Sequence, residues 1–490
     1  MTVRARWKRW SAITLVILVA VGGAGAGLVW WKFFKPGAQE FTDPVARFEY
    51  GTLDGELLAG IPYSIFMVLP RVFPDLVSKY ATEGYGPKKP GFGGYGAFGL
   101  AWEEGQRLPF GLSIKRLGFE RVTINCALCH TTSYRLSASD EPHFAVGGPA
   151  HTLSLQGLLR FLIAASHDER FSATRLIPEI NVHFPMDWID RVDFAAVLIP
   201  GTREALHLVE GQLGWMNSKP AWGPGRDDAF NLPKYILTQT PWDNTTGNTD
   251  FPAVWRLGSR KGQLYHSAGE AKSLYAVVAT SAIGIGSLPT GAFVERNEWL
   301  EDFIAKAEPP KFPRPIDPGL AIQGQAIYQA RCSECHAEGG KRTGTAIPLQ
   351  ELGTDPEHVS GWNQANADRM NLVVRTLGAA NADVEDGQGG YVARSLVGLW
   401  LQGPYLHNGS VPTLWDLLSA PDKRPGVFYR GYDVVDFDDV GFVSSTGSDA
   451  ESYGFRFDTG IRGNGNGGHL FGTDLSDADK RALVEFLKTL

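Results

Sequence analysis

The hydrophobic pattern of the chain begins with one long apolar run. Residues 10–31 carry no charged side chain and are rich in Ala, Val, Leu, Ile and Gly. Four cations precede this run, namely Arg4, Arg6, Lys8 and Arg9. Such a run is long enough to span a bilayer as a helix, and the cations before it favour the cytoplasmic side. We therefore expect a membrane anchor at residues 1–35; a cleaved signal peptide is the alternative, because residues 22–27 are small.

Two further stretches show the spacing of amphipathic helices. Ile322, Ala326, Ile327 and Ala330 recur at helical intervals and lead directly into Cys332. At the end of the chain, an i, i+3, i+4, i+7 stripe is formed by Leu483, Phe486, Leu487 and Leu490. Ser476 is the expected N-cap of this closing helix, and Asp477 and Asp479 fall in its first turn. The pattern predicts that residues 319–490 begin and end with a helix.

A proline-rich stretch separates this C-terminal part from the rest of the chain. Residues 308–318 read EPPKFPRPIDP, and such a sequence cannot continue a helix. We predict a linker at residues 309–318, an N-terminal domain at residues 36–308 and a C-terminal domain at residues 319–490. Residues 165–300 contain loop-like runs rich in Trp, Gly and Pro, which typically shape a pocket or a docking face.

Composition narrows the class of protein only slightly. The 490 residues are enough for two to four domains. The 58 glycines and 30 prolines favour loops between short helices. A net charge of -7 argues against a nucleic-acid partner, because no general cationic surplus is present to neutralise phosphates.

The four cysteines of the chain fall into two identical motifs. They read Cys126-Ala-Leu-Cys129-His130 and Cys332-Ser-Glu-Cys335-His336. The pattern Cys-x-x-Cys-His attaches c-type haem: the two thiols bind the vinyl groups and the histidine becomes the proximal iron ligand. Vicinal redox disulfides or one four-cysteine zinc site are alternatives, but neither explains why histidine follows both pairs. We therefore expect two covalent haems in a mainly helical, loop-rich protein of two cytochrome c-like domains after one transmembrane helix.

The second axial ligand decides what each haem can do. For the second haem the candidates are His358, Met370, His407 and His469. His469 is favoured because it follows the glycine-rich stretch 463–468, and glycine lets the backbone approach a macrocycle closely. For the first haem, His143, His151, His167 and Met216 are candidates without a clear leader, and an iron without a second protein ligand is the preferred hypothesis.

Several segments beyond the motifs carry a family resemblance. These are Arg394–Leu414, which contains Pro404-Tyr-Leu-His407-Asn-Gly-Ser-Val-Pro-Thr-Leu414, the run Pro425-Gly-Val-Phe-Tyr429, the glycine-rich loop at His469 and the closing helix. Together with the two motifs they resemble the bacterial di-haem cytochrome c peroxidase superfamily, and most closely its rubber oxygenase branch. The resemblance is strong in the C-terminal domain and looser in the first.

The resemblance implies roles for individual residues. His130 would be the sole protein ligand of a first haem that binds dioxygen, whereas His336 and His469 would both hold the second haem. Trp215 and Phe230 would line the first haem pocket, with core packing as the alternative role. His407 would support the cofactors from between the haems. In some relatives a calcium ion lies between the domains, and the sequence leaves that question open.

These expectations define a function and one alternative. The first is a peroxidase- or oxygenase-like oxidoreductase on the periplasmic side of a bacterial inner membrane. Its second haem would relay electrons from a redox protein or a quinol-linked donor, and its first haem would act on peroxide or dioxygen. The alternative is an electron-transfer cytochrome with two six-coordinate haems. The chain is shorter than the rubber oxygenases, which argues against rubber itself as the substrate.

Overall fold

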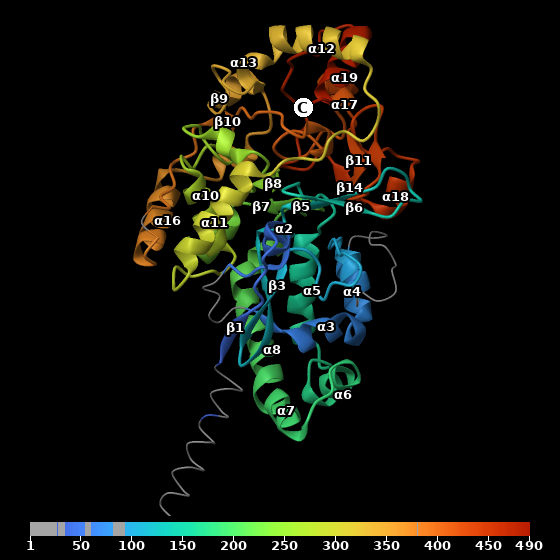
Figure 1. Ribbon diagram of the computed structural model, residues 1–490. Helices are drawn as coiled ribbons and strands as arrows, with labels where there is room; N and C mark the ends of the chain where they lie inside the picture. Colours follow the sequence, from blue (N-terminus) through green and yellow to red (C-terminus); the bar gives the residue numbers. More distant parts are fainter. Residues whose placement is uncertain (1–26, 28–34, 54–59, 82–93, 380) are drawn as a thin grey trace, which may run out of the picture.

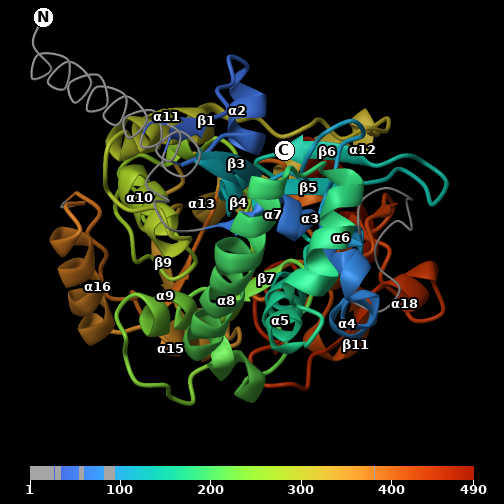
Figure 2. The same cartoon turned by 90° about the horizontal axis from the view of Figure 1, so that it is seen from below.

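The computed structural model describes residues 27, 35–53, 60–81, 94–379 and 381–490 (Figure 1). Helix accounts for 43% and strand for 12% of the structure. The helices α10 (Leu274–Gly284), α11 (Phe293–Lys306) and α16 (Gln364–Thr376) lie on one side of the molecule. Figure 2 shows the same helices opposite α4 (Pro74–Tyr80) and α18 (Asp449–Tyr453).

The fold class and location expected from the first apolar run need correction. The longest helix that the structure describes, α8 (Ile199–Leu213), has 15 residues, whereas a spanning helix needs about 20 apolar residues. No helix in the described part of the chain is long and apolar enough to cross a bilayer. Of residues 10–31, only Gly27 belongs to that part. An N-terminal transmembrane helix and a location at the inner membrane are therefore not supported.

The first Cys-x-x-Cys-His motif lies between strands. An antiparallel sheet has the order β1 (Pro36–Ala38), β3 (Leu112–Leu117), β4 (Phe119–Ile124) and β2 (Ile61–Pro62). The motif follows β4 at once as the short helix η2 (Cys126–Leu128), and β5 (Thr131–Tyr134) begins directly after its histidine. β5 pairs with β6 (His143–Val146). The backbone on both sides of the motif is therefore held by sheet hydrogen bonds.

The part of the chain before the proline-rich stretch contains several further helices. They are α2 (Pro44–Tyr50), α3 (Tyr63–Val72), η1 (Tyr95–Phe98), α5 (Leu155–His167), α6 (Ala173–His183), α7 (Trp188–Asp193), η3 (Phe194–Leu198), η4 (Gly214–Ser218), α9 (Asn231–Ile236) and η5 (Leu257–Arg260). Of these, α2 and α3 contact this sheet. A buried apolar cluster joins α3 and α5 to the sheet, with Phe66 and Phe161 among its members.

A second apolar cluster crosses the predicted linker. Before the linker it contains Phe230, Val254 and most of the buried face of α10; after the linker it contains Trp362 and Met370. The stretch 309–317 itself is free of regular structure. The two predicted domains therefore share one core, and their limits stay a prediction.

The C-terminal part is built on two packed helices. These are α12 (Pro318–Arg331) and α19 (Asp477–Leu487). The close approach has a clear cause: a Cβ at Gly324 would meet the carbonyl of Ala482. Ser476 caps α19 by accepting from the backbone of Asp479, so the predicted closing helix and its cap are confirmed.

The predicted first C-terminal helix is confirmed. α12 leads into Cys332 as expected. Ile322 is 69% exposed, whereas Gly324 and Tyr328 are buried. The apolar spacing located the helix correctly. Ile327 packs against the C-terminal core, and Gly324 and Tyr328 make the contact with α19.

The remaining elements are short. The helices are α13 (Ser333–His336), α14 (Leu349–Leu352), α15 (Glu357–Ser360), η6 (Leu399–Leu401), α17 (Leu414–Leu417) and η7 (Pro421–Lys423). The strands form antiparallel pairs: β7 (Arg226–Asp228) with β8 (Asn248–Asp250), β9 (Ala346–Pro348) with β10 (Gly390–Val392), β11 (Val427–Arg430) with β14 (Phe455–Asp458), and β12 (Val435–Asp436) with β13 (Gly441–Phe442).

Candidate functional site

Both motif histidines are oriented in the same way. The Nδ1 of His336 lies 2.7 Å from the carbonyl of Arg394, and that of His130 lies 2.9 Å from the carbonyl of Pro252. A carbonyl only accepts, so each Nδ1 carries the proton and each Nε2 keeps a lone pair for a metal. Both motifs therefore present a histidine in the form that ligates haem iron.

His469 faces His336 at the spacing of two ligands of one metal. Their ring centroids are 6.2 Å apart. An imidazole nitrogen lies about 2 Å from a bound metal, and the ring centre lies about 1 Å further, so two ligands need about 6 Å. Burial lowers the pKa of His469 to about 4, and His336 and Arg424 add to the effect. The imidazole is thus neutral, as a ligand must be.

The loop that carries His469 is held in a strained conformation. His469 has a φ of 47°, a region that residues other than glycine adopt only when their surroundings fix it. Arg424 supplies that fixation: its guanidinium donates to the carbonyls of Asn466 at 2.6 Å and Gly468 at 2.9 Å. The backbone N–H of His469 also donates to the carbonyl of Leu352 at 2.7 Å.

A cavity of about 370 Å³ lies between these histidines. Its wall includes Cys332 and Cys335 together with His336 and His469. Apolar side chains line much of the rest, among them Leu352, Leu399, Leu414, Leu418, Leu483 and Leu487. Two thiols at the edge, two imidazoles across the space and an apolar wall fit a covalently attached haem.

The first motif is fixed by a buried asparagine. Asn125 donates from its amide to the carbonyl of Gly51 at 3.0 Å and to the hydroxyl of Ser113 at 2.8 Å. Its side-chain oxygen accepts from the backbone of Ala127 at 2.9 Å. Asn125 therefore locks the turn that presents Cys126 and Cys129.

The alternatives to haem find no geometric support. All four cysteines are free. Among the residues that the structure describes, which include every cysteine, no group of three or more His, Cys, Asp or Glu side chains could hold a metal ion. The two motifs therefore do not combine into a zinc site.

The sequence candidates for a second ligand of the first haem lie in different environments. His143 is exposed in β6 and stacks on Tyr134. His167 is exposed and bonds Glu210, and Met216 is buried beside Trp215. His151 is buried, stacks on Phe442 at 3.8 Å and bonds the hydroxyl of Thr132 at 2.9 Å.

The two predicted pocket residues are buried in separate clusters. Trp215 packs with Trp222 and Tyr235. Phe230 belongs to the cluster that includes Ala127 of the first motif. The structure thus does not bring Trp215 and Phe230 together, and their role at the haem stays a prediction.

His407 lies in a row of stacked rings. Its ring centroid is 3.8 Å from that of Tyr391 and 6.1 Å from that of His358. His358 in turn stacks on Phe230 at 4.3 Å, and Phe230 stacks on Trp362 at 5.2 Å. His407 and Tyr391 also line the cavity at the second motif. The row therefore runs from that cavity into the shared core cluster, which also includes Ala127 of the first motif.

The remaining sequence candidates for the second haem are engaged elsewhere. His358 uses both ring nitrogens: Nδ1 lies 2.9 Å from the carbonyl of Gly247, and Nε2 lies 2.6 Å from the hydroxyl of Ser267. Met370 is buried in the shared core. Neither side chain is available to the cavity at His336.

A buried ion pair joins the segment after His407 to the N-terminal part. Arg430 lies 2.7 Å from Asp250 and donates to the carbonyl of Gly409 at 2.6 Å. Arg226 donates to the carbonyl of Asn408 at 3.0 Å. Gly409 has a φ of 59°, and a Cβ there would clash with both Asp250 and Arg430. The glycine of the His-Asn-Gly sequence is therefore required by this contact.

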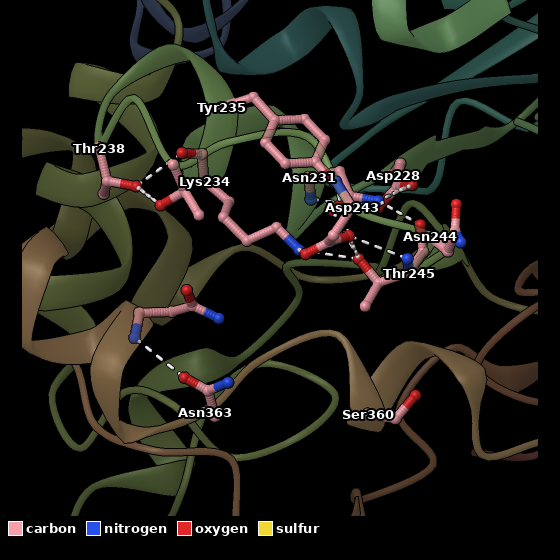
Figure 3. A network of polar contacts seen from close by, with 12 residues as sticks. Asp228, Asn231, Lys234, Tyr235, Thr238, Asp243, Asn244, Thr245, Ser360 and Asn363 are labelled. Carbon is pink, nitrogen blue, oxygen red and sulfur yellow. Dashed lines mark hydrogen bonds and ion pairs between the residues drawn. The ribbon is translucent and has the colours of Figure 1, made fainter. Parts of the chain in front are cut away.

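A polar network holds the chain beyond Phe230 (Figure 3). The buried Lys234 donates to Asp243 at 2.8 Å and to the hydroxyl of Thr245 at 2.7 Å. The hydroxyl of Tyr235 donates to the other oxygen of Asp243 at 2.7 Å. Asn231 donates to Asp228 at 2.7 Å. These contacts fix α9 and the loop that follows it.

We expect the Asp243→Asn variant to lose about 1–2 kcal/mol of unfolding free energy, because the buried Lys234 ammonium loses its carboxylate. Burial alone would raise the pKa of Asp243, but hydrogen bonds from Lys234, Thr245 and Tyr235 outweigh it and lower the pKa. The ionised carboxylate therefore stabilises the fold above about pH 4, and this contribution is lost as pH falls through the lowered folded-state pKa.

Urea unfolding at several pH values measures this difference. Asp383→Asn is the matched control, because Asp383 pairs with Arg375 and its side chain is 42% exposed, as is that of Asp243. Two outcomes would contradict the role of the network. One is an equal loss of unfolding free energy in Asp243→Asn and Asp383→Asn; the other is a difference in unfolding free energy between Asp243→Asn and the parent that does not decrease at acidic pH.

Sequence reasoning missed three polar residues near the motifs, of which Glu270 is buried and His266 and Arg394 are partly buried. His266 has a buried Nε2 without a hydrogen-bond partner, and neither carboxylate oxygen of Glu270 has one. Burial raises the pKa of Glu270 to about 8. Arg394 lines the cavity. The available signal was the likeness of Tyr265-His266-Ser-Ala-Gly269 to Tyr405-Leu-His407-Asn-Gly409.

Comparison with known proteins gives a partial match. A family model described as RoxA-like, cytochrome c-like matches residues 390–429. The uncharacterized protein y4iJ of Sinorhizobium fredii (strain NBRC 101917 / NGR234) is 30% identical over 257 residues, which cover 39% of this chain and 42% of the relative. The uncharacterized protein y4iM of the same strain is 28% identical over 285 residues, which cover 49% of this chain and 64% of that relative. The chain thus spans less than two thirds of either relative.

The family match supports the resemblance to the rubber oxygenase-like cytochromes. The matched stretch contains Tyr391, Arg394 and His407, which line the cavity at the second motif. A cytochrome c-like segment implies covalent c-type haem with its iron. The matched segment therefore indicates a haem cytochrome, which is compatible with an oxidoreductase.

Proposed function

We propose that the chain is a di-haem c-type cytochrome that reduces or activates a small oxidant at its first haem. In this proposal His336 and His469 hold the second haem, and His130 is the one protein ligand of the first. The second haem receives electrons from a redox protein, and the oxidant is dioxygen or peroxide. The haem iron, when bound, supplies the redox chemistry.

A difference between the two motif histidines carries this proposal. His336 has an imidazole across from it at 6.2 Å. Within the described part of the chain, His130 has no ring contact of that kind. Two strong ligands make an electron-transfer haem, whereas an unfilled position allows a small molecule to bind. The asymmetry supports a relay role for the second haem and a reactive role for the first.

The protein groups between the sites suit electron transfer. The stacked row from His407 and Tyr391 through His358 to Phe230 keeps aromatic rings in contact from the second cavity to the core at the first motif. His358 is held at both nitrogens, so its ring cannot rotate away. This row supports the role proposed for His407 as a residue between the haems.

Spectra of the purified holoprotein test the proposal. We expect one high-spin and one low-spin ferric haem by visible and electron-spin spectroscopy, with cyanide or carbon monoxide binding at one haem. Two low-spin haems that bind neither probe would instead indicate an electron carrier and would exclude an open first haem.

The His469→Ala variant tests the ligation of the second haem. We expect one low-spin signal to become high-spin, because His336 would remain the only strong ligand. His143→Ala is the control, since His143 is exposed in β6. An unchanged spin state in His469→Ala would show that another group is the ligand.

A further inference from the structure

His266 lies at the start of a tightly pinned loop. The backbone N–H of Tyr265 donates to the carbonyl of Ala271 at 2.8 Å, which closes the loop. The carbonyls of Ser267 and Ala268 accept from Val392 at 2.9 Å and Gln388 at 3.1 Å. His266 has a φ of 62°, in a region that side chains rarely adopt unless the surroundings impose it. The loop thus holds this imidazole in one place.

The imidazole of His266 has an unmet hydrogen-bonding capacity. Its Nε2 is buried and has no partner, an arrangement that is unfavourable unless a further group is present. Burial lowers the pKa of His266 to about 4, with smaller contributions from Arg394, Arg260, His358 and His130. The ring is therefore neutral near pH 7, with one nitrogen as a donor and the other as an acceptor.

The surroundings of the loop include the first motif. Tyr265, Ala268 and Ala271 belong to the same apolar cluster as Ala127, and Cys126 packs against that cluster. Ser267 and Pro252 both line the cavity at the second motif, and the carbonyl of Pro252 accepts from His130 of the first motif.

The chain repeats this arrangement at the second motif. Tyr405 and Val411 form a bridge like that of Tyr265 and Ala271. Each loop contains a residue with positive φ, His266 in one and Leu406 in the other. Each loop lies a short way downstream of a residue whose carbonyl accepts from a motif histidine. This residue is Pro252 for the first loop and Arg394 for the second. The second loop brings both Leu406 and His407 to the wall of its cavity. When the tyrosines and glycines of the two loops are aligned, His266 takes the position of Leu406 and Ser267 that of His407, so the first loop carries its histidine one position earlier.

We propose that His266 is the distal hydrogen-bonding residue of the first haem. Its Nε2–H would donate to the small oxidant that binds at the first haem, and His266 would not ligate the iron. The absence of a His130 ring contact at the 6.2 Å spacing of His336 and His469 argues against ligation, within the described residues. This inference rests on the proposed function, because it needs an open first haem.

Three variants of the holoprotein test the assignment. His266→Gly removes the imidazole without a penalty for positive φ, and His266→Asn keeps a donor in a residue that tolerates that conformation. His151→Gly is the matched control, since the Nε2 atom of His151 is likewise buried without a partner. We expect cyanide to bind His266→Gly about tenfold more weakly than the parent. The infrared stretch of bound carbon monoxide should move to higher wavenumber, and Asn should restore part of both effects.

The outcomes separate this inference from the proposed function. Cyanide affinity and carbon monoxide stretch that stay unchanged in His266→Gly, or change equally in His151→Gly, would overturn the role of His266 while an open haem remains. Conversion of a low-spin haem to high-spin in His266→Gly would show that His266 ligates the iron. That result would overturn both the role proposed here for His266 and the open first haem of the proposed function. Two low-spin haems without cyanide binding in the parent would overturn the proposed function itself.

Discussion

Replacing Cys332 and Cys335 together by alanine is expected to leave a protein with one covalent haem, and replacing Cys126 and Cys129 to remove the other. Each attachment consumes two thiols, and the chain contains only four cysteines. Haem attachment should be lost completely at the altered motif and should be unchanged at the other motif. Loss of the second haem should also lower the stability of the protein, because the cavity of about 370 Å³ at the second motif would be left empty.

Intact-protein mass and the haem absorbance per chain measure this result. Glu334→Gln is the control, because it changes a residue inside the second motif and keeps both thiols. A parent protein without the mass of two haems, or a double variant that keeps both, would be incompatible with haem attachment at these motifs.

The second large effect is expected for stability: Asp250→Ala should lower the unfolding free energy by about 3–5 kcal/mol. Arg430 is buried, with 1% of its side chain exposed, and Asp250 is its ion-pair partner at 2.7 Å. Without that carboxylate the guanidinium keeps only carbonyl acceptors, those of Gly409 and Pro224. A buried charge that loses its counter-charge is costly, since water cannot solvate it.

Urea unfolding of the holoprotein checks this value. Asp302→Ala is the control, because the carboxylate of Asp302 is 64% exposed and pairs with Lys306 on the surface of α11. The unfolding free energy of this variant should fall by less than about 0.5 kcal/mol. Similar losses in the two variants would show that the buried pair does not anchor the segment after His407.

Local patterns in the sequence determined the chemistry and two helices. Each haem motif is a run of five residues, and its function needs only that short order of thiols and imidazole. The cap and stripe of α19 act within a few residues of one another. His469 was also a sequence candidate, because its glycine-rich neighbours are local as well. Hydropathy alone predicted a membrane anchor, and the described helices do not support one.

Only the tertiary structure decided which distant residues meet. The core shared across the proline-rich stretch, the pairing of Asp250 with Arg430 and the stacking of Phe230 on His358 join residues more than a hundred positions apart in sequence. Such contacts depend on how elements pack, and no local spacing encodes them. His266 was missed for the same reason: its Nε2 is enclosed without a partner only when the loop is pinned against residues 388–392.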